Sequence, residues 1–110
     1  MGIPRRDSIT QRPVLEVVLF KLKPGADEAA FLAASEAVMP DLRTMRGFMG
    51  RELFKDADGR WMDSVHWHSL EDAHRAAEAF LSLSCAQTLM ALIDEPSITM
   101  LHLEPARVYS

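Results

Sequence analysis

VLEVVLFKL, at residues 14–22, is the stretch that determines the fold. It has the length of a β-strand and carries only two charged residues, Glu16 and Lys21. A strand with one face in water alternates apolar and polar residues, whereas a strand covered on both faces need not. We therefore predict that residues 14–22 form a strand that is buried on both faces of a sheet.

The segment that follows this strand has the pattern of a helix. Lys23-Pro24-Gly25 ends the strand with turn residues, and Asp27 is a suitable N-cap. Apolar residues then recur at spacings of three or four: Phe31, Ala34, Val38, Leu42 and Met45. Pro40 lies inside this pattern and lacks the N–H of a helix interior. We expect one helix over residues 27–46 with a kink or short break at Pro40.

The rest of the chain repeats the alternation of strand and helix. Strands are predicted at 48–55 and 61–67, joined by a hairpin turn, and a last strand at 98–103. Between them, Ser69 begins a helix over 70–83, and a second helical piece covers 85–93. Right-handed crossovers applied to this βαββαβ order give a ferredoxin-like α+β fold. Its four-stranded antiparallel sheet has the order 4-1-3-2, with two main helices on one face.

Two helices cover only one face of such a sheet, so the other face needs a cover from outside the chain. A second copy is the simplest cover, and we expect a homodimer that associates through the sheet face. Residues 14–103 form the domain. Residues 1–13 are expected to be a flexible extension, and residues 104–110 a short tail.

Composition narrows the class of protein. At 110 residues the chain is one domain, and a net charge of -4 argues against a nucleic-acid binder. The single cysteine, Cys85, cannot form an internal disulfide. No apolar run approaches the roughly 20 residues that span a bilayer, and residues 1–13 lack the apolar stretch of a secretory signal. We expect a cytoplasmic protein with no membrane or nucleic-acid partner.

Histidines supply the candidate chemistry. His66 and His68 flank Trp67, so both project from one face of their strand. In the predicted strand order, Glu16, His66 and His102 converge if their registers agree. A carboxylate beside imidazoles can move a proton near neutral pH. A shift of one residue in register exchanges the faces, so the sequence alone does not fix which face holds His66.

Other interpretations of the same residues stay open. Glu16, His66 and His102 can be structural polar groups that hydrogen-bond across the dimer, which is the simplest interpretation, and His66 with His68 can also bind a divalent metal. Trp61 and Trp67 share one face of their strand, either as core residues or as a pocket wall. Arg51 is either a residue at the solvent or dimer rim or a ligand for a carboxylate or phenolate.

Three stretches resemble the dimeric α+β barrel superfamily: VVLFKLKPGAD at 17–27, RGF at 46–48 and DGRWMDSVHWHSLEDAHRAAEAF at 58–80. The most similar branches are the antibiotic-biosynthesis-monooxygenase-type and the stress-responsive barrel proteins. The resemblance implies a homodimer whose sheets pack face to face, with a small-molecule pocket between sheet and helices in each subunit. The superfamily includes cofactor-free monooxygenases of polyphenols, heme-degrading enzymes, muconolactone-type isomerases and members without known activity.

Residue by residue, the resemblance carries over only in part. The heme-degrading branch has Asn, Trp and His where this chain has Val18, Phe80 and Met90, so we do not expect heme oxygenation. The stress-responsive branch has His where this chain has Glu16.

The expected function is a cofactor-independent monooxygenase or isomerase acting on a small aromatic or ring substrate, without cofactor or metal. The alternative is a non-catalytic, ligand-binding or stress-related homodimer. The candidate residues are Glu16, His66 and His102 for catalysis and Arg51, Trp67, His68 and Phe80 for substrate binding.

Overall fold

The computed structural model of the protein describes residues 13–110, so that the extension expected at 1–13 falls, apart from Pro13, outside the described residues. The chain forms four strands, four helices and one short 3-10 helix in this part. Their order and bounds are β1 (Val14–Lys21), α2 (Glu28–Ala37), α3 (Met39–Thr44), β2 (Phe48–Lys55), β3 (Arg60–Trp67), α4 (Leu70–Phe80), α5 (Ser84–Met90), η1 (Glu95–Ser97) and β4 (Thr99–Leu103).

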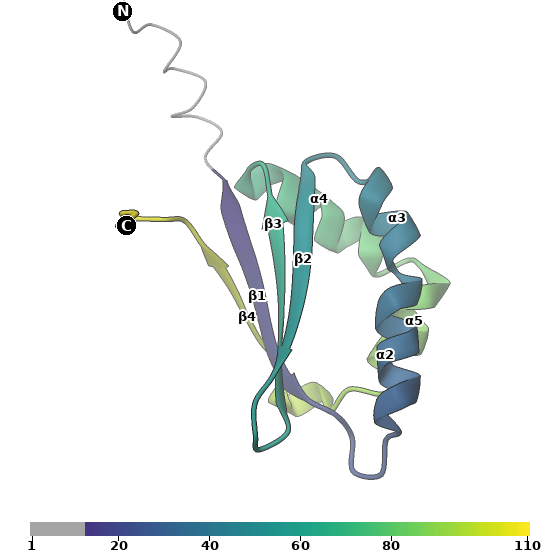
Figure 1. The fold of residues 1–110 in the computed structure, drawn as a ribbon. Helices are drawn as coiled ribbons and strands as arrows, with labels where there is room; N and C mark the ends of the chain where they lie inside the picture. Colours follow the sequence, from purple (N-terminus) through teal and green to yellow (C-terminus); the bar gives the residue numbers. More distant parts are fainter. Residues whose placement is uncertain (1–12) are drawn as a thin grey trace, which may run out of the picture.

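The sheet has the order β2-β3-β1-β4, and every neighbouring pair is antiparallel. This is the predicted order 4-1-3-2 read from the other edge, and the ferredoxin-like α+β prediction is confirmed. All four helices lie on one face of the sheet, and the opposite face carries no element of the described chain (Figure 1). Within residues 13–110, no helix is long and apolar enough to cross a bilayer.

The first helical segment differs from its prediction. We expected one kinked helix, and the structure instead has two helices, α2 and α3, separated at Val38. Pro40 lies in the first turn of α3, where no N–H is needed, so the proline starts a new helix rather than kinking the old one. Asp27 does cap α2, because its carboxylate accepts a hydrogen bond from the Ala29 N–H at 3.3 Å.

Strand register sorts the side chains onto two faces. Glu16 is paired with Val65 and with His102, and Val18 with Asp63 and with Met100. Because side chains alternate along a strand, these residues face the helices. The same face buries Trp61, Trp67 and Phe20, and Phe31 of α2 packs edge-on against Trp61 with ring centroids 4.8 Å apart. The predicted shared face of Trp61 and Trp67 is therefore confirmed.

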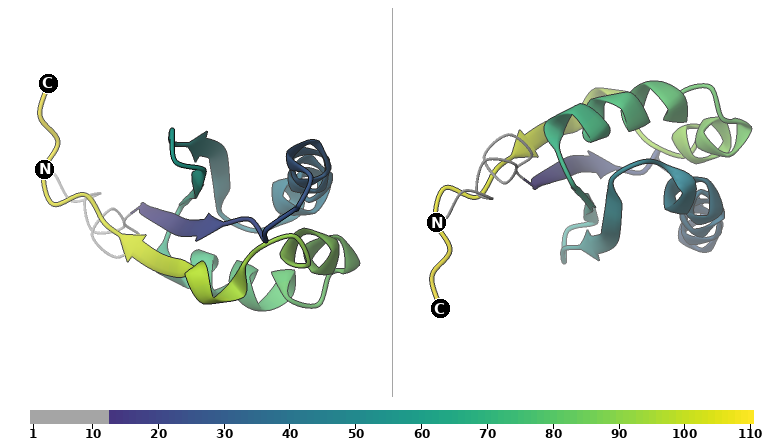
Figure 2. Two further views of the ribbon diagram at one scale, coloured as in Figure 1. Left: turned by 90° about the horizontal axis from the view of Figure 1, so that it is seen from below. Right: turned by 90° about the horizontal axis from the view of Figure 1, so that it is seen from above.

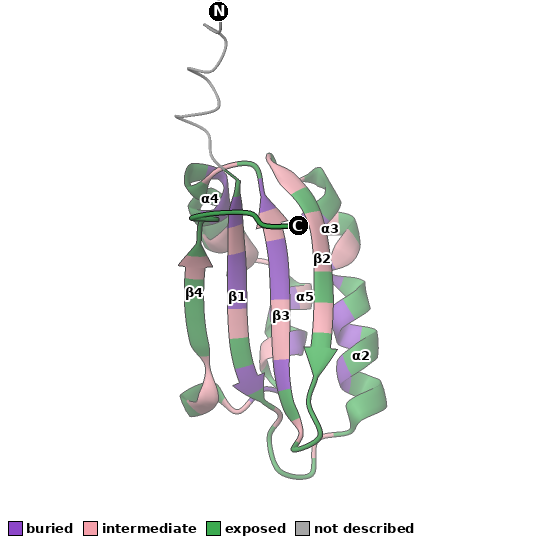
Figure 3. Ribbon diagram, turned by 60° about the vertical axis from the view of Figure 1, so that its left-hand side comes forward, coloured by how far each residue is buried: buried purple, intermediate pink, exposed green. Residues whose placement is uncertain are grey.

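The other face of the sheet, which we call the open face, lies in front of the helices in Figure 3, where its strands change along their length between buried, intermediate and exposed residues. Several of its large apolar members are exposed, with Leu19 at 39 %, Leu101 at 41 % and Phe54 at 50 % of their full surface, whereas Val17 is buried. The members of the open face are Leu15, Val17, Leu19, Gly50, Glu52, Phe54, Met62, Ser64, His66, Thr99, Leu101 and Leu103.

The chain after β4 leaves the sheet. Residues 104–110 have no regular structure and extend away from the body of the domain (Figure 2). Val108 and Tyr109 are each 86 % exposed, so this tail buries almost no apolar surface against the rest of its own chain.

Candidate functional site

A cavity of about 390 Å³ lies between the helix-facing side of the sheet and the four helices. Its volume falls in the range of small-molecule sites. Only three of the residues that line it are charged: Glu16, Arg51 and Asp63. The remaining lining residues are apolar and come from the strands, from η1's C-cap Ile98 and from the helices, where Ala76 and Ala77 of α4 leave space beside the sheet.

Glu16 projects from the central strand β1 into this cavity and is only 8 % exposed. Both of its carboxylate oxygens have partners. The indole Nε1–H of Trp67 donates to Oε1 at 3.3 Å, and Nε2 of His102 lies 3.0 Å from Oε2. A carboxylate has further lone pairs, so Glu16 can still accept a proton or hydrogen bond from a molecule in the cavity.

His102 reaches Glu16 from the edge strand β4. Its side chain is 21 % exposed and, unlike Glu16, does not line the cavity. The ring of His74, on α4, meets the ring of His102 edge-on, with centroids 5.0 Å apart. The two imidazoles and the carboxylate therefore form a short row from the cavity to the surface.

Arg51 is held by the protein's own acceptors. It donates to both carboxylate oxygens of Asp63, at 2.9 and 2.7 Å, and to the hydroxyl and carbonyl of Ser35, at 2.7 and 2.8 Å. Its remaining contact is the Met39 sulfur at 3.5 Å. A guanidinium has five N–H groups, and these five contacts occupy them. The expectation that Arg51 lies at the solvent or dimer rim is wrong, since its side chain is 7 % exposed on the helix-facing side.

His66 does not join Glu16 and His102. It pairs with Leu15 in the sheet register, which places it on the open face. There its Nε2 lies 2.7 Å from the carboxylate of Glu52, and the Ser64 hydroxyl donates to the same carboxylate at 3.2 Å. These two hydrogen bonds, His66 first, hold the pKa of Glu52 below its usual value. The predicted convergence of Glu16, His66 and His102 is thus right for Glu16 and His102 and wrong for His66.

Of the other residues expected to bind substrate, some lie in the cavity and one does not. Trp67 and Phe80 line the cavity. His68 is exposed just beyond the end of β3, where its backbone N–H donates to the Gly47 carbonyl at 2.8 Å. Among residues 13–110, no cluster of three His, Cys, Asp or Glu side chains that could hold a metal ion includes His66 or His68.

Asp63, Ser35 and His74 were not anticipated. Strand parity identifies Asp63 in retrospect. It is an even number of positions from Trp61, Val65 and Trp67 on β3, so it must lie on the same face as these residues. No pattern in the sequence indicates Ser35 or His74, since both lie on helices whose rotation against the sheet is set by packing.

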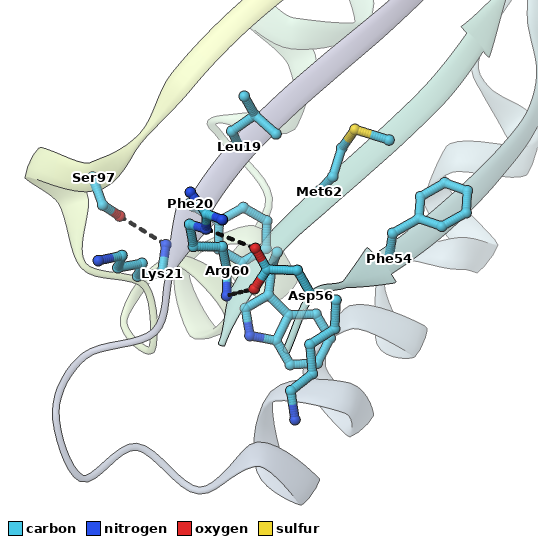
Figure 4. Close-up of a pocket in the computed structure, with 10 residues that line it drawn as sticks. Leu19, Phe20, Lys21, Phe54, Asp56, Arg60, Met62 and Ser97 are labelled. Atoms are coloured by element: carbon cyan, nitrogen blue, oxygen red, sulfur yellow. Dashed lines mark hydrogen bonds and ion pairs between the residues drawn. The ribbon is translucent and has the colours of Figure 1, made fainter. Parts of the chain in front are cut away.

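A second depression, of about 360 Å³, lies at the hairpin end of the sheet (Figure 4). It is lined by apolar residues such as Leu19, Phe54 and Met62 and by the charged residues Lys21, Lys55, Asp56 and Arg60. Arg60 donates to the Asp56 carboxylate at 2.7 Å, and the Lys21 backbone N–H donates to the Ser97 hydroxyl at 2.8 Å. It brings no acid and imidazole together, in contrast to the cavity beside Glu16.

Comparison with solved structures identifies the fold. SnoaB of Streptomyces nogalater, a cofactor-independent oxygenase solved as a mutant, matches with a TM-score of 0.74 and 17 % identity over 88 % of this chain and 96 % of its own. A proposed antibiotic biosynthesis monooxygenase from Bordetella bronchiseptica matches at 0.73 and 20 %, over 88 % and 100 %. A similar proposed monooxygenase from Nitrosomonas europaea matches at 0.70 and 18 %, over 87 % and 92 %.

No family model matches the sequence, and no curated protein matches it. The structural likeness shows that the chain shares the ferredoxin-like α+β fold of these solved proteins.

Proposed function

We propose that this chain is a cofactor-independent enzyme of the dimeric α+β barrel type that removes a proton from a small ring substrate. Glu16 is the proton acceptor. The observation that supports this role is a buried carboxylate, anchored by Trp67 and His102, that faces a mostly apolar cavity whose two other charged residues, Arg51 and Asp63, pair with each other. A positioned base of this kind accelerates proton transfer by about a hundredfold or more.

The charges in the cavity favour a neutral substrate. Arg51 is neutralised by Asp63 at 2.7 Å and has no N–H left over for a ligand. An anionic substrate would therefore meet the negative charge of Glu16 without a free cation nearby, at a cost in desolvation. A neutral ring compound with an acidic C–H or O–H fits the same surroundings, because its proton can hydrogen-bond to the Glu16 carboxylate.

Two reactions begin with this step. In oxygenation, the carbanion left by proton removal gives two electrons to molecular oxygen, which forms a C–O bond and, after protonation, a hydroperoxide. Loss of the second proton from the same carbon then makes the C=O bond, breaks the O–O bond and releases the outer oxygen as water. In isomerisation, the proton returns to a different carbon of the same molecule. Oxygenation is the first choice, because SnoaB shares this fold and is a cofactor-independent oxygenase.

Two neutral probes separate these possibilities. Nitrobenzisoxazole loses its ring proton to a base, its N–O bond breaks, and a coloured cyanophenolate forms without oxygen. Anthrone loses a proton and then takes up one O2 to give anthraquinone and water. We expect both probes to be converted. Glu16→Gln should lower kcat for nitrobenzisoxazole at least about 100-fold, because the amide cannot accept the proton.

Glu52→Gln is the matched control. Glu52 is also a carboxylate hydrogen-bonded to a histidine, but it lies on the open face. Its replacement should leave both activities unchanged. Conversion of nitrobenzisoxazole without oxygen uptake on anthrone would favour the isomerase. Binding of both probes without conversion would favour the alternative, a non-catalytic ligand-binding dimer.

The homodimer is the second part of the proposal. The open face presents exposed Leu19, Leu101 and Leu103 beside buried Val17, and a second copy with the same face would cover them. The cavity lies on the other side of the sheet, so each subunit would carry its own complete site.

A further inference from the structure

We propose that His102 is the positioning residue that fixes the Glu16 carboxylate for proton abstraction, and that His74 holds His102 in place. The inference rests on the proposed function of Glu16 and adds the residues that make it effective. It concerns two histidines on different elements, β4 and α4, that reach the site from the surface side.

The geometry assigns His102 a role that acts through Glu16. Its Nε2 lies 3.0 Å from Oε2 of Glu16, and an ionised carboxylate only accepts hydrogen bonds, so the Nε2 proton lies between them. His102 does not line the cavity and cannot touch a substrate there. It therefore holds the base rather than serving as one.

Two donors on opposite oxygens are needed to hold the carboxylate. Trp67 donates to Oε1 at 3.3 Å from the central strand β3, a long hydrogen bond by ordinary standards. His102 supplies the shorter contact from the other flank. A glutamate side chain has several rotatable bonds, and fixing its carboxylate in one orientation lowers the entropy lost on reaching the transition state.

His74, on α4, packs its ring against the ring of His102. Their rings meet edge-on at 5.0 Å, with an angle of 87° between the planes. Glu16 on β1 and His74 on α4 therefore contact His102 from two sides. Because β4 is a five-residue edge strand, paired only with β1, packing from α4 adds an anchor that the sheet does not supply.

The chain contains its own control for this arrangement. Glu52 and His66 form the same kind of pair, at 2.7 Å, on the open face and away from the cavity. A substitution of His66 removes a Glu–His hydrogen bond of equal chemistry without disturbing the cavity.

The test uses nitrobenzisoxazole with four variants: His102→Gln, His102→Asn, His102→Phe and His66→Phe. The Gln amide N–H can occupy the position of the imidazole Nε2 and still donate to Glu16, whereas Asn is too short and Phe has no donor. We expect kcat to fall about tenfold in the Asn and Phe variants with KM unchanged, and to fall less than about threefold in the Gln variant. His66→Phe should match the wild type.

A further variant, His74→Ala, should lower kcat by about threefold, again without a change in KM. Thermal unfolding of each variant separates positioning from a loss of structure. If His102→Phe does not fold, the comparison of Gln with Asn decides alone.

Equal kcat values in His102→Gln and His102→Asn would overturn the inference, as would a rise in KM at constant kcat. If Glu16→Gln abolishes turnover while the His102 variants keep it, only the positioning role fails. If Glu16→Gln itself retains full turnover, the proposed function fails and the positioning role fails with it.

Discussion

Glu16 and His66 lie on neighbouring strands but on opposite faces of the sheet, because the register pairs His66 with Leu15 and Glu16 with Val65. The protein consequently contains two separate Glu–His pairs. One, Glu16 with His102, borders the cavity, and the other, Glu52 with His66, lies on the open face. The pairs can be altered independently, since the sheet separates them.

The open face predicts the state of association. Replacing Leu19, which is 39 % exposed on the open face of the central strand β1, by Asp should convert a homodimer to a monomer, because a charge would be buried without a partner. Leu32→Asp is the control: Leu32 is 44 % exposed on α2 and should leave the dimer intact. Sedimentation equilibrium measures both. A monomeric wild type at micromolar concentration would contradict the proposed dimer.

Because the Arg51–Asp63 pair is buried, we expect its disruption to lower the stability of the protein strongly. Asp63→Asn leaves the Arg51 charge uncompensated, and we expect it to lower the free energy of unfolding by about 3 kcal/mol or more. Lys55 and Glu28 form a pair of the same length, 2.7 Å, but with both side chains more than 40 % exposed. Glu28→Gln should cost about 1 kcal/mol or less. Chemical denaturation compares the two, and equal losses would show that Arg51 is not held by Asp63.

The backbone angle and surroundings of Gly47 predict that no side chain is tolerated at this position. Its φ is +83°, and a Cβ atom there would collide with the side chain of Asp72 on α4. We expect Gly47→Ala to destabilise the fold by about 2 kcal/mol or more. Gly25 has a similar φ of +81° with open space around it, so Gly25→Ala should cost only about 1 kcal/mol. A similar loss in both variants would exclude the clash with Asp72.

The Glu52–His66 pair predicts a pH dependence. The pKa of Glu52 is lowered in the folded protein, so its contribution to stability is present above the ordinary range of a glutamate and is lost as the pH falls through the folded value. His66→Phe should raise the pKa of Glu52 and make the acid loss of stability smaller. Titration of the side-chain carboxyl resonances by NMR measures this.

Asp56 is the internal control for that titration. Its pKa is also lowered, first by the hydrogen bond from the Arg60 backbone N–H and further by the Arg60 side chain, with no involvement of His66. The pKa of Asp56 should therefore be the same in the wild type and in His66→Phe. An unchanged pKa of Glu52 in that variant would show that the hydrogen bond seen between Glu52 and His66 is absent in solution.

The sequence by itself determined the order of elements, the strand order and the caps at Asp27 and Ser69, the latter accepting from the Asp72 N–H at 3.1 Å. These features depend on local periodicity and on residues close together in the chain. The spacing of Trp61 and Trp67 also placed both on one face, because alternation along a strand needs no tertiary information.

Only the tertiary structure decided which polar residues meet. The parity of β3 relative to β1 separates Glu16 from His66, and a shift of one residue would have reversed that outcome. The burial of Arg51 beside Ser35 depends on how α2 packs on the sheet, and the contact of His74 with His102 depends on the position of α4. Such contacts join residues far apart in the chain, and their geometry is fixed by packing between elements rather than by the pattern within any one of them.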